Sequence, residues 1–183
     1  MINDFEKVLI ALKYWNLKLR NPKEEKNFQD RLIIQKLAFL LKHQGIKMNY
    51  NFTLYKNGPY CAELTKDYYN NSWRVVNLDA QFNPFRREVE IFNKINEIVI
   101  YHPLYEKYPA SLLEAVSTAY YLKLNYSDIL DDELFKNTKN EKPYLSDKLI
   151  IIGINLVKKL MFKPELLTDD IKEEIREWDS AED

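Results

Sequence analysis

The side chains that most often carry nucleophilic or metal chemistry are scarce in this sequence. The only histidines are His43 and His102, and the only cysteine is Cys61. A metal-binding or basic histidine needs partners at a fixed spacing, such as His-Glu-x-x-His, and neither histidine has them. Cys61 follows Gly58-Pro59-Tyr60 at an expected helix N-terminus, which favours a thiolate, but no histidine lies nearby to act as its base. The sequence therefore predicts no catalytic residue, no metal site and no cofactor.

Acidic residues occur in pairs, whereas the glycines are isolated. Asp131-Asp132-Glu133 and Asp169-Asp170 fall in polar stretches near expected helix starts, where carboxylates are favoured by the helix dipole. They indicate solvated faces rather than an acid–base pair. Gly45, Gly58 and Gly153 are far apart, so no glycine-rich loop is available to bind a phosphate. We therefore expect a protein that is not an enzyme, and an enzyme using Cys61 is the remote alternative.

Tyrosine is unusually frequent, with 13 copies in the chain. One region combines tyrosines with cations, namely Tyr50, Tyr55, Tyr60, Tyr68 and Tyr69 beside Lys47, Lys56, Lys66 and Arg74. Such a mixture can stack on nucleic-acid bases or anchor a protein partner. Tyrosines also commonly rim a core with the hydroxyl in water, and we expect this arrangement for most of them. The cluster is nevertheless the best candidate binding surface in the sequence.

Length and charge limit the remaining possibilities. A chain of 183 residues fits one mostly helical domain spanning residues 1–183. The net charge of −1 provides no overall basic field for nucleic acid or membrane. Residues 1–6 lack the pattern of a signal peptide, and the apolar run 149–157 is too short to cross a bilayer. We therefore expect a cytoplasmic protein with no membrane partner, ending in an acidic, frayed helix over 165–183.

Helical periodicity dominates the chain, with apolar residues recurring every three or four positions. Asn3 and Glu6 have the spacing of a capping box for the first helix, and Gly45 is the expected stop of the second. The predicted helices span residues 4–19, 24–44, 61–70, 86–102, 111–122, 127–137 and 146–161, and a last helix begins at Pro164. Pro103 and Pro109 are expected to bracket a loop.

Two segments depart from the helical period. Residues 48–55 alternate apolar and polar side chains, which predicts a half-buried strand. Asn57-Gly58-Pro59 then breaks the chain, and residues 73–78 form a second β-like run that could pair with the first. The predicted fold class is therefore mainly α with a small β-sheet, an α+β arrangement.

Two stretches of the sequence resemble a known family. These are Ile34-Gln35-Lys36-Leu37-Ala38-Phe39-Leu40-Leu41 and the run from Phe52 to Asp67, which contains Tyr55-Lys56-Asn57-Gly58-Pro59-Tyr60. They resemble the YwgA-like proteins of bacteria and archaea and, more distantly, the Panacea domain of SocA-like antitoxins. Leu113 to Leu122 and Lys142-Pro143-Tyr144 resemble the C-terminal helices of that family.

The resemblance implies a winged-helix-like helical domain. It also implies a function through protein binding, since antitoxin relatives neutralise a toxin or adapt it to a protease. The family motif maps to Tyr55, Gly58, Pro59, Tyr60, Leu64 and Asp67. We interpret it as structural: Gly58-Pro59 forms a fixed corner between strand and helix, with Tyr55 and Tyr60 packed on either side. The helix-capping Ser of the family is replaced here by Cys61, a poor cap.

Two functional hypotheses follow. The first is a non-enzymatic regulatory or protein-interaction protein linked to toxin–antitoxin or mobile-element systems, with a protein partner or a second copy in a homodimer. The alternative is a winged-helix DNA-binding regulator whose phosphate contacts would be Arg31, Lys36, Lys42, Lys47 and Lys56. At about 100° per residue, Lys36 points away from Arg31 and Lys42, so we expect only weak DNA binding.

Overall fold

The fold, taken from a computed structural model, is described for residues 2–24, 27–162 and 168–180. In chain order its elements are α1 (Asp4–Tyr14), α2 (Phe28–His43), β1 (Thr53–Tyr55), β2 (Gly58–Tyr60), α3 (Ala62–Asn70), α4 (Ser72–Val76), α5 (Arg86–Ile95), the π-helical turn η2 (Asn96–Ile100), α6 (Pro103–Lys107), α7 (Pro109–Asn125), α8 (Asp131–Glu141), α9 (Asp147–Met161) and α10 (Asp169–Ser180). The predicted class, mainly α with a small antiparallel sheet, is confirmed. Among these residues, no helix is long and apolar enough to cross a membrane.

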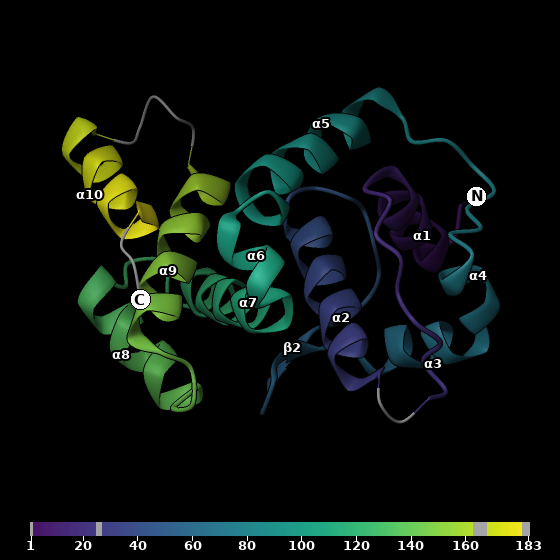
Figure 1. Ribbon diagram of the computed structural model, residues 1–183, viewed down its shortest axis with the longest axis horizontal. Coiled ribbons are helices and arrows are strands. Elements are labelled where there is room, and N and C mark those ends of the chain that lie inside the picture. Colours follow the sequence, from purple (N-terminus) through teal and green to yellow (C-terminus); the bar gives the residue numbers. More distant parts are fainter. Residues whose placement is uncertain (1, 25–26, 163–167, 181–183) are drawn as a thin grey trace.

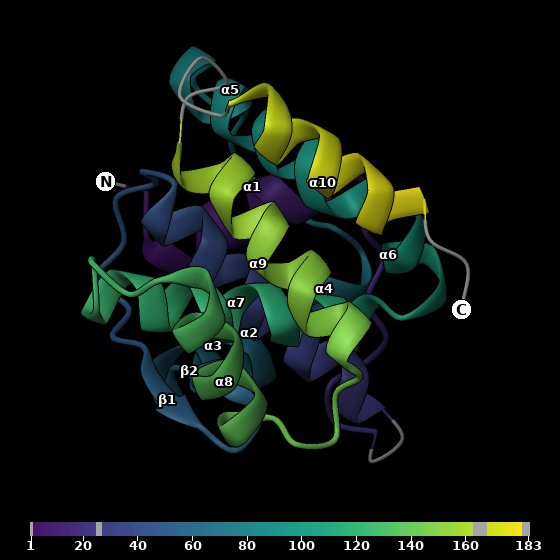
Figure 2. The same cartoon turned by 90° about the vertical axis from the view of Figure 1, so that its left-hand side faces the viewer.

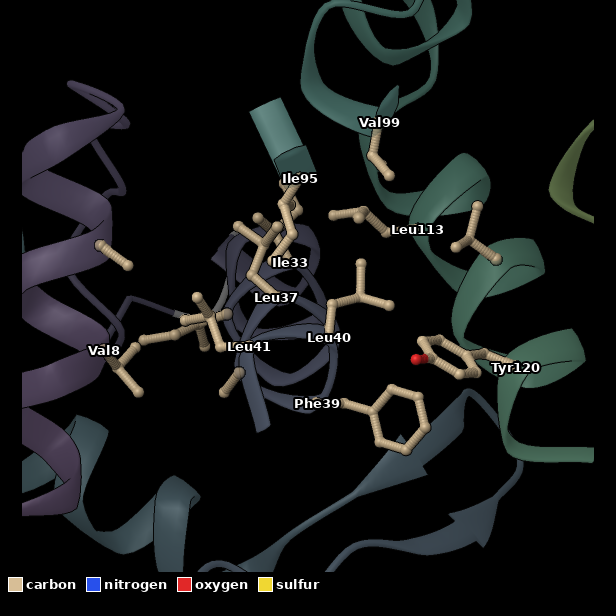
Figure 3. Packing of buried hydrophobic residues seen from close by; sticks show 14 of the residues in the cluster. Val8, Ile33, Leu37, Phe39, Leu40, Leu41, Ile95, Val99, Leu113 and Tyr120 are labelled. Atoms are coloured by element: carbon tan, nitrogen blue, oxygen red, sulfur yellow. The ribbon is translucent and has the colours of Figure 1, made fainter. Parts of the chain in front are cut away.

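Helix α2 lies at the centre of the fold. Figure 1 shows α1, α2, α7, α9 and α10 following one another across the molecule, and α2 packs on α7, which packs on α9. In the core, Leu41 of α2 lies toward Val8 of α1, while Phe39 lies toward Tyr120 of α7 (Figure 3). The central helix therefore buries side chains on nearly its whole circumference, polar ones included. The last helix, α10, lies across α9 (Figure 2).

The sheet is a hairpin of two neighbouring strands, whereas the prediction paired residues 48–55 with residues 73–78. β1 and β2 are antiparallel, with Thr53 opposite Tyr60, Leu54 opposite Pro59 and Tyr55 opposite Gly58. Of the predicted strand 48–55, only the last three residues, Thr53–Tyr55, form a strand. The β-like run 73–78 is instead the short helix α4, so its prediction as a strand is wrong. Its partner position is already taken by β2, which follows β1 after a turn of two residues.

Several helix boundaries also differ from those predicted. α1 ends at Tyr14, because Asn16 adopts a positive φ of 51° that turns the chain. The helix predicted from residue 24 begins at Phe28, and the helix predicted over 127–137 is shifted to Asp131–Glu141. Gly45, with φ of 114°, does end α2 as predicted. The predicted start at Pro164 lies outside the described residues.

The segment predicted as a loop between Pro103 and Pro109 contains a helix. α6 starts at Pro103, where the missing N–H costs nothing. The Nδ1 atom of His102 accepts the amide of Leu104 at 3.2 Å and so caps this helix. Prolines that were read as breaks therefore act as the first residues of α6 and of α7.

Candidate functional site

Lysines from two helices hold the hairpin through its carbonyl oxygens. The ammonium of Lys36 in α2 donates to the carbonyl of Pro59 at 2.9 Å. The ammonium of Lys142, at the C-terminal end of α8, donates to the carbonyls of Tyr55 and Lys56 at 3.1 and 2.6 Å. Both lysine side chains are almost fully buried, so these bonds are shielded from water. The hairpin is therefore tied to the helical core from two sides.

A buried carboxylate lies behind these lysines. Glu114 of α7 is 4% exposed and accepts a hydrogen bond from the hydroxyl of Tyr144. Burial, reinforced by this bond, raises the pKa of Tyr144. Burial lowers the pKa of Lys36 to about 8, with Glu114 opposing the shift and Lys142 adding to it. The region is a buried polar network in which cations outnumber the carboxylate.

Gly58 allows the hairpin to approach this network. Its φ of 84° lies in the left-handed region that favours glycine. A Cβ atom at this position would lie 3.0 Å from Oγ1 of Thr118 and 3.2 Å from Cε of Lys36. Both conformation and packing therefore require glycine here. The place of Gly58 inside β2, rather than at a corner between strand and helix, corrects the expected geometry of the motif.

The prediction that Tyr55 and Tyr60 pack on opposite sides of Gly58-Pro59 is wrong. Their rings pack on each other with centroids 5.3 Å apart, because residues 55 and 60 lie diagonally on one face of the hairpin. Leu64 is fully buried in the core. Asp67 accepts a hydrogen bond from the hydroxyl of Tyr50 at 2.7 Å. The motif thus includes two tyrosine rings on one face of the hairpin and several buried residues that pack the hairpin and α3 against the core.

The start of α3 is fixed by a glutamine of α2. The side-chain oxygen of Gln35 accepts the amide of Cys61 at 2.9 Å, and its nitrogen donates to the carbonyl of Cys61 at 3.0 Å. The Cys61 side chain makes no capping bond and is 2% exposed. Gln35 therefore fixes the backbone of Cys61, the residue before α3, on both its amide and its carbonyl.

An open groove of about 530 Å³ lies between α2, the hairpin and α3. Its lining consists of Phe28, Arg31, Leu32, Gln35, Lys36, Tyr55, Lys56, Asn57, Gly58, Tyr60, Thr65, Tyr68 and Tyr69. Aromatic rings supply much of the wall, and the charged groups are all cations. Among the described residues, no carboxylate lines it. Most of the tyrosine cluster recognised in the sequence is thereby gathered in one place.

Arg31 and Tyr68 are two polar residues of the groove lining with different surroundings. The guanidinium of Arg31 lies over the ring of Phe28, 5.4 Å from its centroid, and one of its nitrogens donates to the hydroxyl of Tyr69 at 2.7 Å. Tyr68 is 1% exposed, and its buried hydroxyl has no hydrogen-bond partner within the described part of the chain. Burial raises the pKa of this hydroxyl, which keeps it neutral and able to donate.

The five predicted phosphate contacts do not form one surface. The prediction for Lys36 is wrong, because this side chain is 1% exposed and donates to Pro59. Lys42 is half-buried and donates to the carbonyl of Tyr50. Lys47 and Lys56 are exposed, whereas Arg31 stacks on a ring in the groove. Two of the five cations are therefore engaged by the backbone of the protein itself.

The histidines have structural surroundings. The ring of His43 packs against Phe39 with centroids 4.4 Å apart, and burial, followed by Lys42, lowers its pKa. His102 caps α6. Within residues 2–24, 27–162 and 168–180, no cluster of three or more His, Cys, Asp or Glu side chains is arranged to hold a metal ion.

Sequence reasoning missed the residues that hold the hairpin from a distance. Gln35, Glu114, Lys142 and Tyr144 were seen only as parts of helices, although each lies in a segment that resembles the family. Phe28, at the start of α2, is 48% exposed and lines the groove. Comparison of the chain with protein-family models, curated proteins and solved structures gave no match.

Proposed function

We propose that this protein is a non-enzymatic interaction protein that binds an extended segment of a partner protein in the groove between α2, the hairpin and α3. The observation that carries this proposal is the combination of exposed aromatic rings and cations around one open cavity of about 530 Å³. Tyrosine and arginine are the side chains most enriched among residues that dominate binding energy. Tyr55 is 60% exposed, so a partner would gain by covering its ring.

The composition of the groove favours binding over catalysis. Among the described residues, its lining contains no His, Cys, Asp or Glu that could act as a base or activated nucleophile. Lys36, whose pKa is lowered to about 8 by burial, is used to hold Pro59. The resemblance to antitoxins that act by binding proteins supports the same reading.

Site-specific photocrosslinking tests the proposal. Tyr55 is replaced by a benzophenone amino acid in the full chain, and the protein is irradiated in the cells that produce it. We expect a covalent adduct with one predominant protein, identified by mass spectrometry, that disappears when Lys56→Gln is added. The matched control places the same probe at Tyr101, which is 72% exposed and outside the groove. Equal adducts at both positions, or none at Tyr55, would refute the proposal.

A further inference from the structure

The polar groups of the groove point to the chemistry of what it binds. We infer that its occupant is an acidic peptide segment, one of whose carboxylates pairs with the guanidinium of Arg31. This inference rests on the proposed protein-binding function and names the class of partner sequence.

Within the described part of the chain, two cations of the groove have no carboxylate partner. Arg31 and Lys56 lie in its lining, and no carboxylate among the described residues does. Lys36 also lines the groove, but its ammonium is buried, donates to the carbonyl of Pro59 and is attracted by Glu114. The neighbouring acid Asp30 is held by Arg20, whose Nε lies 3.0 Å from the carboxylate. Glu114 is engaged by Tyr144 behind the hairpin. An anion entering the groove would therefore meet cations without competing against an acid of the protein.

Arg31 is oriented to receive a carboxylate. Its contact with Phe28 and its bond to Tyr69 fix the plane of the guanidinium, and no ion pair joins it to a carboxylate in the described residues. Only one of its nitrogens is used by Tyr69. A guanidinium has five N–H donors in a planar fork that matches a carboxylate, so most of its donors remain for a ligand.

The apolar walls favour a peptide over inorganic phosphate. Phe28 and Leu32 on one side and Tyr55 and Tyr60 on the other offer ring and aliphatic surface next to the cations. A phosphate ion would leave this surface in water. A peptide covers it with an apolar side chain beside the acidic one, and gains from both the hydrophobic effect and the ion pair.

Selection from two displayed peptide libraries tests the inference. The libraries are identical random short peptides, except that Asp and Glu are replaced by Asn and Gln in the second. We expect only the acidic library to yield peptides that bind the full-length protein. The affinity of an enriched peptide, measured by fluorescence anisotropy, should fall by about tenfold with Arg31→Gln and also with Lys56→Gln, since charge-assisted bonds are lost. Lys47→Gln removes the same charge outside the groove and should leave the affinity unchanged.

The outcomes separate the two proposals. Peptides from the acid-free library that bind as tightly, and whose binding depends on Tyr55, would contradict the inference that the occupant is acidic. They would still support protein binding in the groove. No groove-dependent peptide from either library would refute protein binding itself. Equal loss with Lys47→Gln and Arg31→Gln would show diffuse attraction and also contradict the inference. Because Lys56 is exposed, Lys56→Gln keeps the test valid if Arg31→Gln fails to fold.

Discussion

Gly58 carries two separate constraints, and a comparison with Gly45 distinguishes them. Both residues have a positive φ, 84° and 114°. A Cβ on Gly45 would meet Ile91 at 3.5 Å and Arg87 at 3.9 Å, which are ordinary contacts, whereas one on Gly58 would press on Thr118 at 3.0 Å. The two positions thus share backbone strain but differ in packing.

We expect Gly58→Ala to destabilise the protein more than Gly45→Ala. Strain should cost each variant roughly 1–3 kcal/mol. The crowding at Gly58 should add roughly 1–3 kcal/mol, as overpacking does in other cores. Urea denaturation of the two variants beside the wild type measures the difference. A Gly58→Ala protein as stable as Gly45→Ala would show that the hairpin yields to the added atom.

Lys36 makes stability depend on pH in a predictable direction. Its folded pKa of about 8 lies below the ordinary value of 10.5, so between these values the unfolded chain binds more protons. The free energy of unfolding should therefore rise as pH increases through this window. Below about pH 8 both states are protonated, and burial of the charge costs on the order of 3 kcal/mol in full.

The matched variants Lys36→Met and Lys56→Met isolate this effect. Denaturation at about pH 7 and about pH 9.5 should show that wild type and Lys56→Met gain stability at the higher pH. Lys36→Met should lose most of that gain, because Met has no proton to release. The same gain in Lys36→Met as in the wild type would assign the pH dependence to other groups.

The burial of Lys36 was only partly visible in the sequence. Helical spacing predicts that it points away from Arg31 and Lys42, and Lys36 is buried whereas those two are half-buried. The spacing cannot reveal that α2 is surrounded by other elements, so a polar side chain on that side was read as exposed. The acceptor that makes its burial tolerable, the carbonyl of Pro59, lies 23 residues away in sequence.

At the scale of elements, the hairpin depends on helices distant in sequence. Lys142 reaches the carbonyls of Tyr55 and Lys56 from the end of α8. We expect Lys142→Met to speed hydrogen exchange at the amides of Gly58 and Tyr60, because the turn loses one of its links to the core. Lys139→Met, which removes a similar bond to Leu145 within the α8 region, is the control. Unchanged exchange in Lys142→Met would mean that Lys36 alone holds the turn.

Secondary structure was predictable where the helical pattern of apolar residues continues over many positions. The prediction failed where contacts with distant parts of the chain determine the structure. The apolar pattern of α9 predicts its span closely, with Ser146 as its cap. β2 was missed because Pro59 argues against a strand. Pro59 is tolerated because its carbonyl bonds to Lys36 and its missing N–H is not needed opposite Leu54. The strand expected at 73–78 is instead the helix α4, and β1 pairs with β2.

At the scale of the whole molecule, charge distribution argues against tight DNA binding. The net charge is −1, and Lys36 and Lys42 are held by the backbone of the chain itself. We expect weak, sequence-independent binding to duplex DNA that fades as salt increases, since phosphate contacts are few. Fluorescence anisotropy with a random duplex at low and physiological salt measures this. Tight binding at physiological salt would favour the DNA-binding alternative.

The sequence indicated the residue types that line the groove, but not how they are arranged. The sequence places tyrosines beside cations over residues 50–69, which indicates a binding surface. It does not show that Tyr50 turns inward to Asp67 while Tyr55 and Tyr60 face outward. It also does not bring Phe28 and its neighbours on α2 into the same wall, because that contact depends on how α2 packs on α3.

Chemical-shift mapping with an enriched acidic peptide tests the location of binding most directly. Backbone amide spectra of isotope-labelled protein are recorded during titration. We predict that the largest shifts cluster at residues 55–60 and 65–69, with Arg31. A second cavity, of about 650 Å³, lies between α8 and α9 and includes Leu134 and Ile154. Shifts centred there, with residues 55–60 unchanged, would contradict the account.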